Sequence, residues 1–372
     1  MAGRIKIVVL GTRGFPNVQG GVEKHCEELY PRLVKLGCDV TVLVRSPYVP
    51  KEEKIKVWKG VKFEYIWCPR KKSLEAIIHS FLGVFKAKNI KPDILHIHSI
   101  GPSLVTPIAK KLGLKIVMTH HGPDYYRKKW GNIAKTVLKL GEYFGINFSD
   151  KIIVISKWVK ELIQRKYKKN SVFIPNGVSI QNPCPPGEIL KKFKLKKGSY
   201  VFTACRFVPE KGILDLIKAY RRLNNPPFKL VIAGDADHED EYSKKVKYEA
   251  SKSKNIILTG FISGESLREL YSNAALFILP SYYEGLPIAL LEALSYGLPV
   301  LVSDIPAHRE IPLKDFRYFK VGNIDELSDK LLKLYYLGID KKERDSILRL
   351  LQNIYNWDIV AEKVLKVYRD IL

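Results

Sequence analysis

Short apolar runs alternate with amphipathic segments through the first half of the chain. The runs are rich in Val, Ile and Leu, which is typical of strands that are buried on both faces of a parallel sheet. Residues 21–37, between the first two runs, instead repeat apolar residues at the spacing of a helix. The pattern predicts a doubly wound α/β domain with strands in IKIVVLG (5–11), DVTVLVR (39–45), PDILHIHS (92–99), IVMTHHG (116–122) and KIIVIS (151–156).

A stretch rich in Pro, Gly and Asn, IPNGVSIQNPCPPGE (174–188), separates this half from a second one and has the composition of a surface linker. Residues 356–372 carry an apolar helical face. We therefore expect two Rossmann-like domains, at 1–180 and 181–355, and a helix at 356–372. In the second domain, strands are expected in SYVFTAC (199–205), FKLVIAGD (228–235), NIILTG (255–260), LFILPS (276–281) and PVLVSD (299–304), with helices in GILDLIKAYRRL (212–223) and ESLRELYSNA (265–274).

The size and composition agree with two globular domains. A chain of 372 residues exceeds the roughly 250 to 300 residues at which a single core stops growing, so two domains facing each other across a cleft are expected. The five cysteines are odd in number and scattered, which favours reduced thiols over disulfides or a zinc site. The first residues lack a signal-peptide core, and no run of about 18 apolar residues occurs. We expect a cytoplasmic protein that does not span a membrane.

Positive charge is concentrated in the first half of the chain. Residues 1–180 hold 33 lysines and arginines against 13 aspartates and glutamates, whereas residues 181–372 hold 30 against 25, within a net charge of +25. A one-sided field of this kind attracts polyanions such as nucleic acid, an anionic membrane surface or a phosphorylated acceptor. A lysine-rich surface of the thermophile type is the alternative, but its ion-pair networks would need acids as well.

Open parallel sheets bind ligands outside the carboxyl ends of their strands. The residues that directly follow the predicted strands are therefore the candidates for a functional site. They are Gly11–Gly21, His98, His120–Asp124, Arg206–Lys211, Gly234–Asp237, Ser281–Pro287 and Ser303–Glu310.

The segment SYYEGLPIALLEAL places one acid before a predicted helix and a second acid inside it. Gly285 allows a tight turn and Pro287 suits the first helical position, so the free amides of this helix end form an anion site. Glu292 lies five residues beyond Pro287, about 7.5 Å along the helix axis. With a nucleotide diphosphate over the helix start, Glu292 could accept hydrogen bonds from a ribose diol while Glu284 faces the group on the outer phosphate. The alternative is that both acids are solvated residues on the helix flank.

The segment ACRFVPEKGILDLIKAY supplies two cations at the same edge of the sheet. Arg206 directly follows a predicted strand, and Lys211 precedes a helix. A pyrophosphate leaving group suits both, because Arg presents a planar fork of donors and Lys a mobile point charge. Together with the amides near Leu286, they would stabilise charge on a departing diphosphate. A solvated basic loop is the alternative.

A glycine-rich loop, GTRGFPNVQGGVEKH (11–25), joins the first strand to the first helix. It does not match G-x-G-x-x-G and no G-K-[ST] follows, so a dinucleotide fingerprint and a Walker loop are disfavoured. The pair Gly20 and Gly21 still permits a ligand to approach the backbone closely.

Histidines and acids after other strands raise the question of a metal. His98 and His121 follow neighbouring strands, but no carboxylate–histidine helix pair accompanies them, so a metal site is disfavoured and His121 better suits hydrogen bonding to sugar or acceptor hydroxyls. Asp235 and Asp237 form a D-x-D triplet, which holds a divalent cation in sugar transferases of a different fold. Here the triplet follows a strand of a Rossmann-like domain, and we interpret it as a polar loop without metal.

Four of these segments together resemble the family 4 retaining glycosyltransferases of GT-B fold. They are GGVEKH (20–25), CRFVPEKG (205–212), AGDADHEDEY (233–242) and YYEGLPIALLEALSYGLPVLVSD (282–304), and the resemblance covers nearly the whole chain. THHGPDYYRKKW (119–130) further resembles a branch that contains rhamnosyl- and surface-polysaccharide transferases. One departure is SDIPAHREI (303–311), where many members have glycines before the glutamate, here Glu310.

The resemblance implies a role for each matching residue. Arg206 and Lys211 would hold the donor diphosphate, with the Gly285, Leu286 and Pro287 turn beside it. Glu284 would contact the transferred sugar and Glu292 the ribose. Gly20 and Gly21 would approach the diphosphate or sugar, and His121 would contact the sugar. The helix at 356–372 would pack back on the N-terminal domain.

The expected function is that of an enzyme of class EC 2.4, a retaining hexosyltransferase-type glycosyltransferase. It would move a sugar from a UDP- or GDP-sugar, or another nucleotide-sugar, to a hydroxyl of a glycan or lipid-linked acceptor in polysaccharide biosynthesis. We expect no metal cofactor and no nucleic-acid partner. The segments 70–91 and 126–148 combine basic clusters with Trp, Phe, Leu and Ile, as interfacial helices do, so we expect a peripheral site on the inner face of an anionic membrane. Simple packing of both helices on the sheet is the alternative.

Two other functions are compatible with parts of the sequence. A nucleotide-sugar epimerase of similar fold would share the donor cleft but would release a changed nucleotide-sugar without an acceptor. A nucleic-acid-binding protein would explain the basic first half, but no recognised binding motif or stacking platform accompanies it. Neither alternative explains Arg206, Lys211, Glu284 and Glu292 together.

Overall fold

The computed structural model describes residues 4–48, 54–69, 74–127, 130–237 and 239–372. The chain forms two compact units, one made of Met1–Asn176 with Trp357–Leu372 and the other of Gly177–Asn356. These divisions fall close to the boundaries expected at 180 and 355. We call them the N-terminal and C-terminal units and describe each by itself.

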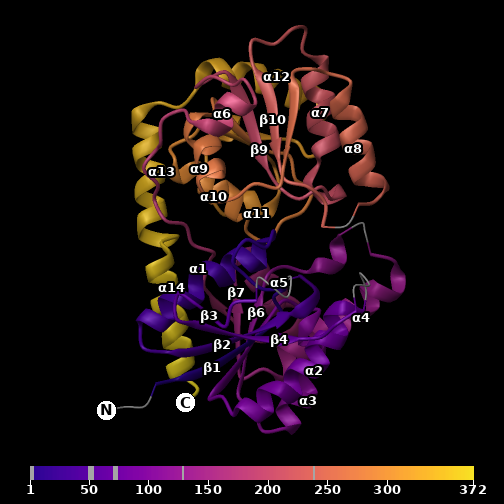
Figure 1. Cartoon of the computed structure of the whole chain (residues 1–372), viewed down its shortest axis with the longest axis vertical. Coiled ribbons are helices and arrows are strands. Elements are labelled where there is room, and N and C mark those ends of the chain that lie inside the picture. The colour runs from indigo at the N-terminus through magenta and orange to yellow at the C-terminus, as the bar shows by residue number, and fades with distance from the viewer. Residues whose placement is uncertain (1–3, 49–53, 70–73, 128–129, 238) are drawn as a thin grey trace. The chain divides into compact units, whose positions relative to one another are not determined.

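The N-terminal unit (Figure 1) is built on a parallel sheet. Its strand order is β3-β4-β2-β1-β5-β6-β7-β8, and the edge strand β3 alone pairs in an antiparallel direction. Val8 of β1 lies between Thr41 of β2 and Leu95 of β5. The strand order reverses between β1 and β5, which makes their carboxyl ends a switch point. The strands are β1 Lys6–Leu10, β2 Asp39–Arg45, β3 Val57–Trp58, β4 Val61–Ile66, β5 Ile94–His98, β6 Ile116–His120, β7 Lys151–Val154 and β8 Val172–Phe173.

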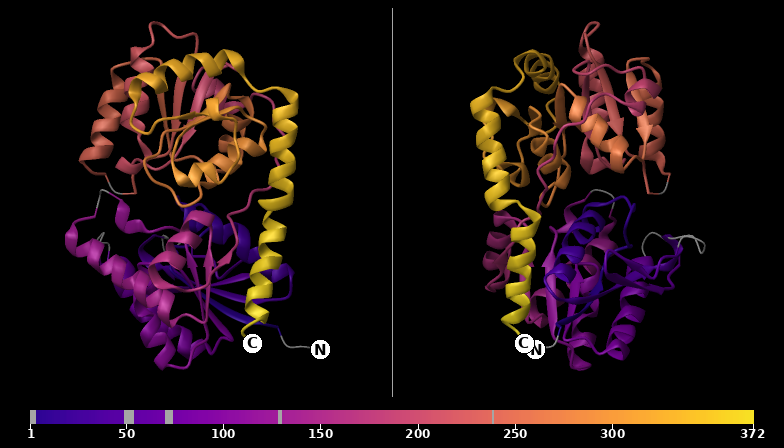
Figure 2. Two further views of the ribbon diagram at one scale, coloured as in Figure 1. Left: turned by 180° about the vertical axis from the view of Figure 1, so that it is seen from behind. Right: turned by 60° about the vertical axis from the view of Figure 1, so that its left-hand side comes forward.

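Helices cover both faces of this sheet, so the central strands β5 and β6 are buried along their whole length. The last helix of the chain belongs to this unit and runs beside its sheet (Figure 2), where Val360, Val364 and Tyr368 are buried and Asp358 pairs with Arg32 at 2.8 Å. The helices are α1 Gly21–Lys35, α2 Glu75–Ile90, α3 Thr106–Lys111, α4 Asn132–Phe148, α5 Lys157–Tyr167 and α14 Trp357–Arg369.

The C-terminal unit has an all-parallel sheet with the strand order β11-β10-β9-β12-β13-β14. This is the doubly wound order, with its reversal between β9 and β12. The strands are β9 Tyr200–Ala204, β10 Lys229–Ala233, β11 Ile256–Gly260, β12 Leu276–Leu279, β13 Val300–Ser303 and β14 Tyr318–Phe319. The helices are α6 Glu188–Lys192, α7 Ile213–Arg222, α8 Glu241–Ser251, α9 Gly264–Asn273, α10 Ile288–Ser295, α11 Pro306–Arg309, α12 Ile324–Leu337 and α13 Lys341–Ile354.

Each strand predicted from an apolar run is present in the structure within two residues at either end. The strands β3, β8 and β14 were not predicted because they are very short, and β4 was not predicted because its sequence mixes charged with apolar residues. One prediction about a helix start is wrong. Pro287 precedes α10 as its N-cap in an extended conformation, and the first helical residue is Ile288. None of the helices in the described part of the chain is both long and apolar enough to cross a membrane.

Candidate active site

The switch point of the C-terminal unit lies where β9 and β12 end side by side. The loop after β9 is held by backbone hydrogen bonds from Cys205 to Ala233 at 2.9 Å and from Phe207 to Asp235 at 3.0 Å. A further bond of 2.8 Å joins the Tyr282 amide to the carbonyl of Glu210. These bonds attach the loop that carries Arg206 and Lys211 to the segment that carries Glu284.

Gly212 allows this loop to approach the end of β12. Its φ of +66° lies in the left-handed region, and a Cβ atom there would come within 2.2 Å of the carbonyl oxygen of Pro280. A side chain would therefore strain the backbone and also collide with it. The glycine that follows Lys211 is required by this close packing.

Lys211, Glu284 and Ser281 form a compact polar group. Lys211 Nζ lies 2.5 Å from Glu284 Oε1, and the Ser281 hydroxyl donates to the same oxygen at 2.7 Å. Burial alone would raise the pKa of the Glu284 carboxyl, but the charge and hydrogen bond of Lys211, with the bond from Ser281, lower the pKa below its ordinary value. The acid is therefore an ionised acceptor in a largely buried site.

Arg206 lies on the same loop but pairs with a different acid. Its Nη1 is 2.9 Å from Asp237 Oδ2, the second acid of the D-x-D triplet. The first acid, Asp235, lies 3.2 Å from Lys247 Nζ. Both carboxylates thus lie next to cations. An anionic ligand that binds Arg206 would therefore displace the Asp237 carboxylate from it.

The helix α10 begins beside this group and carries the second glutamate. Leu286 and the N-cap Pro287 are buried, and the positive end of the helix dipole lies at this turn. The hydroxyl of Tyr271 donates to Glu292 Oε2 at 3.3 Å, and the Tyr271 ring stacks on Tyr296 with ring centroids 5.4 Å apart.

His308 lies within the candidate range Ser303–Glu310, but the sequence pattern assigned it no role of its own. It is fully buried on α11, and its Nδ1 donates to the carbonyl of Ser303 at 2.7 Å. Its Nε2 is buried and finds no hydrogen-bond partner among the described residues. Burial lowers the pKa of His308 to about 4, although the nearby Glu284 carboxylate acts in the opposite direction. The departure SDIPAHREI contained the signal, since it replaces the glycines with a bulkier segment.

The other predicted residues lie at the switch point of the N-terminal unit. Gly20 has a φ of +154°, and a Cβ there would lie 2.0 Å from Glu23 Oε2. Glu23 lies just beyond the candidate range Gly11–Gly21 and was missed. Its carboxylate accepts hydrogen bonds from the backbone amide and the side chain of Arg13, and these bonds hold the glycine-rich loop in place. At Gly21, a Cβ would meet no atom within 4 Å, so a ligand could reach the backbone there.

The two adjacent histidines His120 and His121 have different surroundings. His120 Nε2 lies 3.1 Å from the buried carboxylate of Glu142, which also contacts Lys166 and Tyr167. His121 is partly exposed, and its Nε2 lies 2.9 Å from His98 Nδ1. Burial, with the neighbouring histidines, holds the pKa of His121 well below its ordinary value, so the ring is neutral at neutral pH. His121 is the one that a ligand could reach.

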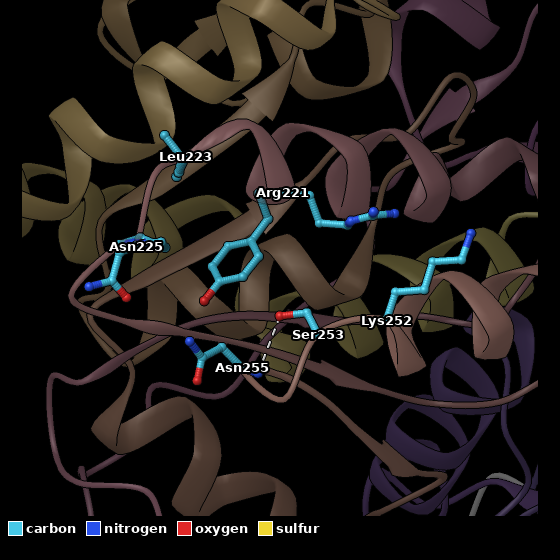
Figure 3. Close-up of a pocket in the computed structure, with 8 residues that line it drawn as sticks. Arg221, Leu223, Asn225, Lys252, Ser253 and Asn255 are labelled. Carbon is cyan, nitrogen blue, oxygen red and sulfur yellow. Dashed lines mark hydrogen bonds between the residues drawn. The ribbon is translucent and has the colours of Figure 1, made fainter.

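A separate hollow in the C-terminal unit lies away from these residues (Figure 3). Its walls come from segments that precede β10 and β11, which places it at the amino ends of the strands, opposite the switch point. Its cations Arg221 and Lys252 both pair with Glu249, at 2.8 and 2.7 Å. It is lined by Tyr220, Arg221, Leu223, Asn225, Pro226, Lys252, Ser253 and Asn255.

A chain with two Rossmann-like units, whose second unit carries a cation pair and a helix start at its switch point, has the fold of a GT-B glycosyltransferase. Residues 19–182 match the family described as Glycosyltransferase Family 4, and residues 187–347 match the family described as Glycosyl transferases group 1. The chain belongs to the family 4 glycosyltransferases, and it is therefore a glycosyltransferase of class EC 2.4.

Relatives and solved structures agree with this assignment. The chain is 30% identical over 280 residues to the UDP-Gal:alpha-D-GlcNAc-diphosphoundecaprenol alpha-1,3-galactosyltransferase of Escherichia coli, covering 70% of this chain and 71% of the relative. It shares its fold with sucrose-phosphate synthase from Thermosynechococcus elongatus, at a TM-score of 0.82 and 20% identity over 99% of both chains. HepE of Anabaena, solved in complex with UDP-glucose, matches at a TM-score of 0.78 and 16% identity, over 99% of this chain and 100% of HepE.

Proposed function

We propose that the chain transfers a sugar from a nucleotide-diphosphate donor to an acceptor hydroxyl with retention of configuration, and that the donor diphosphate binds at the switch point of the C-terminal unit. The contact of Lys211 with Glu284, beside the start of α10, carries this proposal. The cation suits a diphosphate, and the acid suits the sugar attached to it. The family assignment favours a transferase over the epimerase.

The donor would be bound by exchange of partners at two cations. A diphosphate would replace the Asp237 carboxylate as the partner of Arg206. It would also accept a hydrogen bond from Lys211, which would then contact both the diphosphate and Glu284. The backbone amides of Gly285 and Leu286, at the turn before α10, would face its oxygens. Because these groups already supply two positive charges and a helix dipole, we propose that the donor needs no metal ion. Glu292, held by Tyr271, would accept hydrogen bonds from the ribose.

The chemical step would require little from side-chain bases. The bond from the sugar C1 to the phosphate oxygen breaks, and the acceptor oxygen bonds to C1 on the same face. The leaving phosphate takes the proton of the acceptor hydroxyl. Arg206, Lys211 and the helix end would stabilise the negative charge of that phosphate, and Glu284 the positive charge on the sugar ring. His121 would position the sugar through a hydrogen bond, with Gly20 and Gly21 near the diphosphate.

The names of the relatives support a choice of donor and acceptor. The Escherichia coli relative is named for a UDP-sugar donor and a diphosphoundecaprenol acceptor, and HepE was solved with UDP-glucose. We propose a UDP-sugar donor and a lipid-linked saccharide acceptor that carries a diphosphate. The basic N-terminal half suits such an acceptor.

We also propose that the N-terminal unit binds an anionic membrane surface. Exposed apolar side chains on α2 and α4 lie among lysines, with Phe81 46% exposed, Phe85 43% and Ile133 84%. Part of the expected basic character, at 70–73 and 128–129, lies outside the described residues. The described helices still leave apolar side chains uncovered, which favours an interfacial role over simple packing.

One experiment tests the central proposal. The protein is titrated with UDP in a calorimeter, without metal, beside the variant Lys211→Ala. We expect UDP to bind the wild-type chain and to bind the variant more than about 10-fold more weakly, because a desolvated charge-assisted contact is lost. Equal binding by both proteins would contradict the proposed donor site. Product analysis with UDP-sugars and a prenyl-diphosphate saccharide then tests transfer itself.

A further inference from the structure

Three histidines from separate parts of the sequence meet at the switch point of the N-terminal unit. His25 lies on α1, His98 ends β5 and His121 follows β6. One nitrogen from each ring lies within 4.8 Å of the other two. The rings of His25 and His121 are nearly perpendicular, with centroids 4.9 Å apart, and those of His25 and His98 are 5.4 Å apart.

His25 has a nitrogen lone pair that the described protein does not use. Its Nδ1 lies 2.9 Å from Asn176 Oδ1, which accepts a hydrogen bond, so the proton of the neutral ring is on Nδ1. The other nitrogen, Nε2, therefore carries a bare lone pair. It is fully buried and has no hydrogen-bond partner among the described residues. A buried acceptor without a donor is costly, and a ligand bound at this nitrogen would remove that cost.

We propose that His25, His98 and His121 form a binding site for one divalent transition-metal ion, with Zn²⁺ as the ion that fits best. Neutral imidazole is a common ligand of Zn²⁺, and three such ligands leave a fourth position for water or a substrate oxygen. The site lies in the N-terminal unit and shares His121 with the proposed sugar contact, whereas the diphosphate is proposed to bind in the C-terminal unit without metal. It also differs from the expectation drawn from the sequence, where the lack of a carboxylate–histidine helix pair disfavoured a metal.

The distances permit this with small side-chain movements. Imidazole nitrogens about 2.0–2.1 Å from a tetrahedral Zn²⁺ lie about 3.3 Å from one another. His98 Nδ1 and His121 Nε2 are 2.9 Å apart and must separate slightly, while His25 must approach. The proton between His98 and His121 would move to the other nitrogen of the ring that carries it, so both facing nitrogens would present lone pairs while each ring stays neutral. His121 is partly exposed, so an ion and its water can enter on that side.

Further residues already orient the ligands as metal sites require. Asn176 fixes the ring and tautomer of His25, and the hydroxyl of Tyr30 lies 2.5 Å from His98 Nε2. Loss of such an outer partner typically lowers the metal affinity of a site by about 10- to 100-fold. A bound ion would link α1, β5 and the segment after β6. It would also occupy His121, so the ion and a sugar would compete for this side chain if the proposed function is right.

The test uses the full chain after treatment with EDTA. Zn²⁺ is titrated by calorimetry, and Co²⁺ is added separately to record its ligand-field absorption. We expect one ion per chain, a higher melting temperature with Zn²⁺ and the spectrum of a four-coordinate Co²⁺ site. His25→Gln removes a ligand and should abolish all three effects. Asn176→Ala should weaken binding by about 10- to 100-fold, because it removes only the outer partner.

His308→Gln is the matched control, since it removes another buried histidine with an unpaired Nε2 from the C-terminal unit. It should bind Zn²⁺ like the wild-type chain. Circular dichroism checks that each variant folds, and His121→Asn replaces His25→Gln if the latter does not. Absence of Zn²⁺ and Co²⁺ binding by the wild-type chain, or unchanged binding by the folded His25→Gln or His121→Asn variant, overturns the proposal. None of these measurements depends on transferase activity, so the metal site and the proposed function can fail separately.

Discussion

Lys211 Nζ lies 2.5 Å from Glu284 Oε1, although 73 residues separate the two side chains in the sequence. The pair joins the loop after β9 to the segment after β12 at the point where the strand order reverses. The charge of Lys211 and the charge of Glu284 balance each other while no donor is bound. Neither buried charge is therefore unpaired before the donor enters.

Loss of Lys211 should strongly reduce transfer. We expect Lys211→Ala to lower kcat by about 10²- to 10³-fold, because a preorganised charge on the leaving phosphate is lost. Steady-state kinetics with a UDP-sugar measures this. Lys197→Ala, at an exposed lysine of the same unit, is the control and should retain full activity. A similar loss in both variants would mean that net charge, not position, matters.

Gly212→Ala should destabilise the C-terminal unit. An alanine at this position would have to adopt the left-handed conformation of Gly212, which costs about 1–2 kcal/mol. Its Cβ would also lie 2.2 Å from the carbonyl oxygen of Pro280. The melting temperature measures the sum. Gly198→Ala provides the comparison, because Gly198 has a φ of +72° but a Cβ there meets no atom within 4 Å. The Gly212 variant should melt clearly lower than the Gly198 variant. Equal melting temperatures would show that the Pro280 contact relaxes freely.

Asp237→Asn tests whether the D-x-D triplet opposes donor binding or assists it. In the structure Asp237 pairs with Arg206, so its neutralisation should free the guanidinium. A partly exposed ion pair is worth about 0.2–1 kcal/mol, so UDP should bind the variant up to about 5-fold more tightly. Calorimetry is run with and without Mg²⁺. Weaker binding that appears only with Mg²⁺ would instead assign a metal to the triplet.

The Glu142 carboxylate should make the N-terminal unit sensitive to acid. Burial would raise its pKa, but hydrogen bonds from His120, Lys166 and Tyr167 lower it from 4.5 to about 2. A carboxyl whose pKa is depressed by folding stabilises the protein above its unfolded pKa and loses that effect as pH falls toward the folded value. We therefore expect the melting temperature to fall between pH 4.5 and 2, and to fall less steeply in Glu142→Gln.

For that experiment, Glu161→Gln is the control, because Glu161 is exposed on α5 and should leave the pH profile unchanged. A wild-type profile that matches the profile of Glu142→Gln would contradict the role given to Glu142.

Membrane binding should depend on the exposed aromatic side chains of α2. Replacement of Phe81 and Phe85 by Ser should weaken flotation with anionic vesicles by about 10-fold or more, because each buried side chain contributes about 1.5–3 kcal/mol. Tyr336→Ser, at a 70% exposed residue of the other unit, should float like the wild-type chain. Absence of wild-type flotation at low salt would remove the membrane proposal.

Local sequence patterns were enough to predict most of the fold. Residues 39–45 and 116–120 read as strands because apolar residues at most successive positions suit burial on both faces, and this property needs no knowledge of neighbouring strands. The strand β4 mixes charged with apolar residues and was missed, because its stability comes from pairing with the neighbouring strand β2 near the edge of the sheet.

The chemistry of the candidate site was predictable in part for the same reason. Arg206, Lys211 and Glu284 follow apolar runs, and the ends of parallel strands lie at one edge of a sheet. The sequence alone therefore determined the two α/β units and the residue types at the ends of their strands. The tertiary structure decided which side chains meet: Lys211 with Glu284, Arg206 with Asp237, and His25 with Asn176 beside His98 and His121. Strand order and side-chain packing set these contacts, and both depend on residues far apart in the chain, so no local pattern contains them.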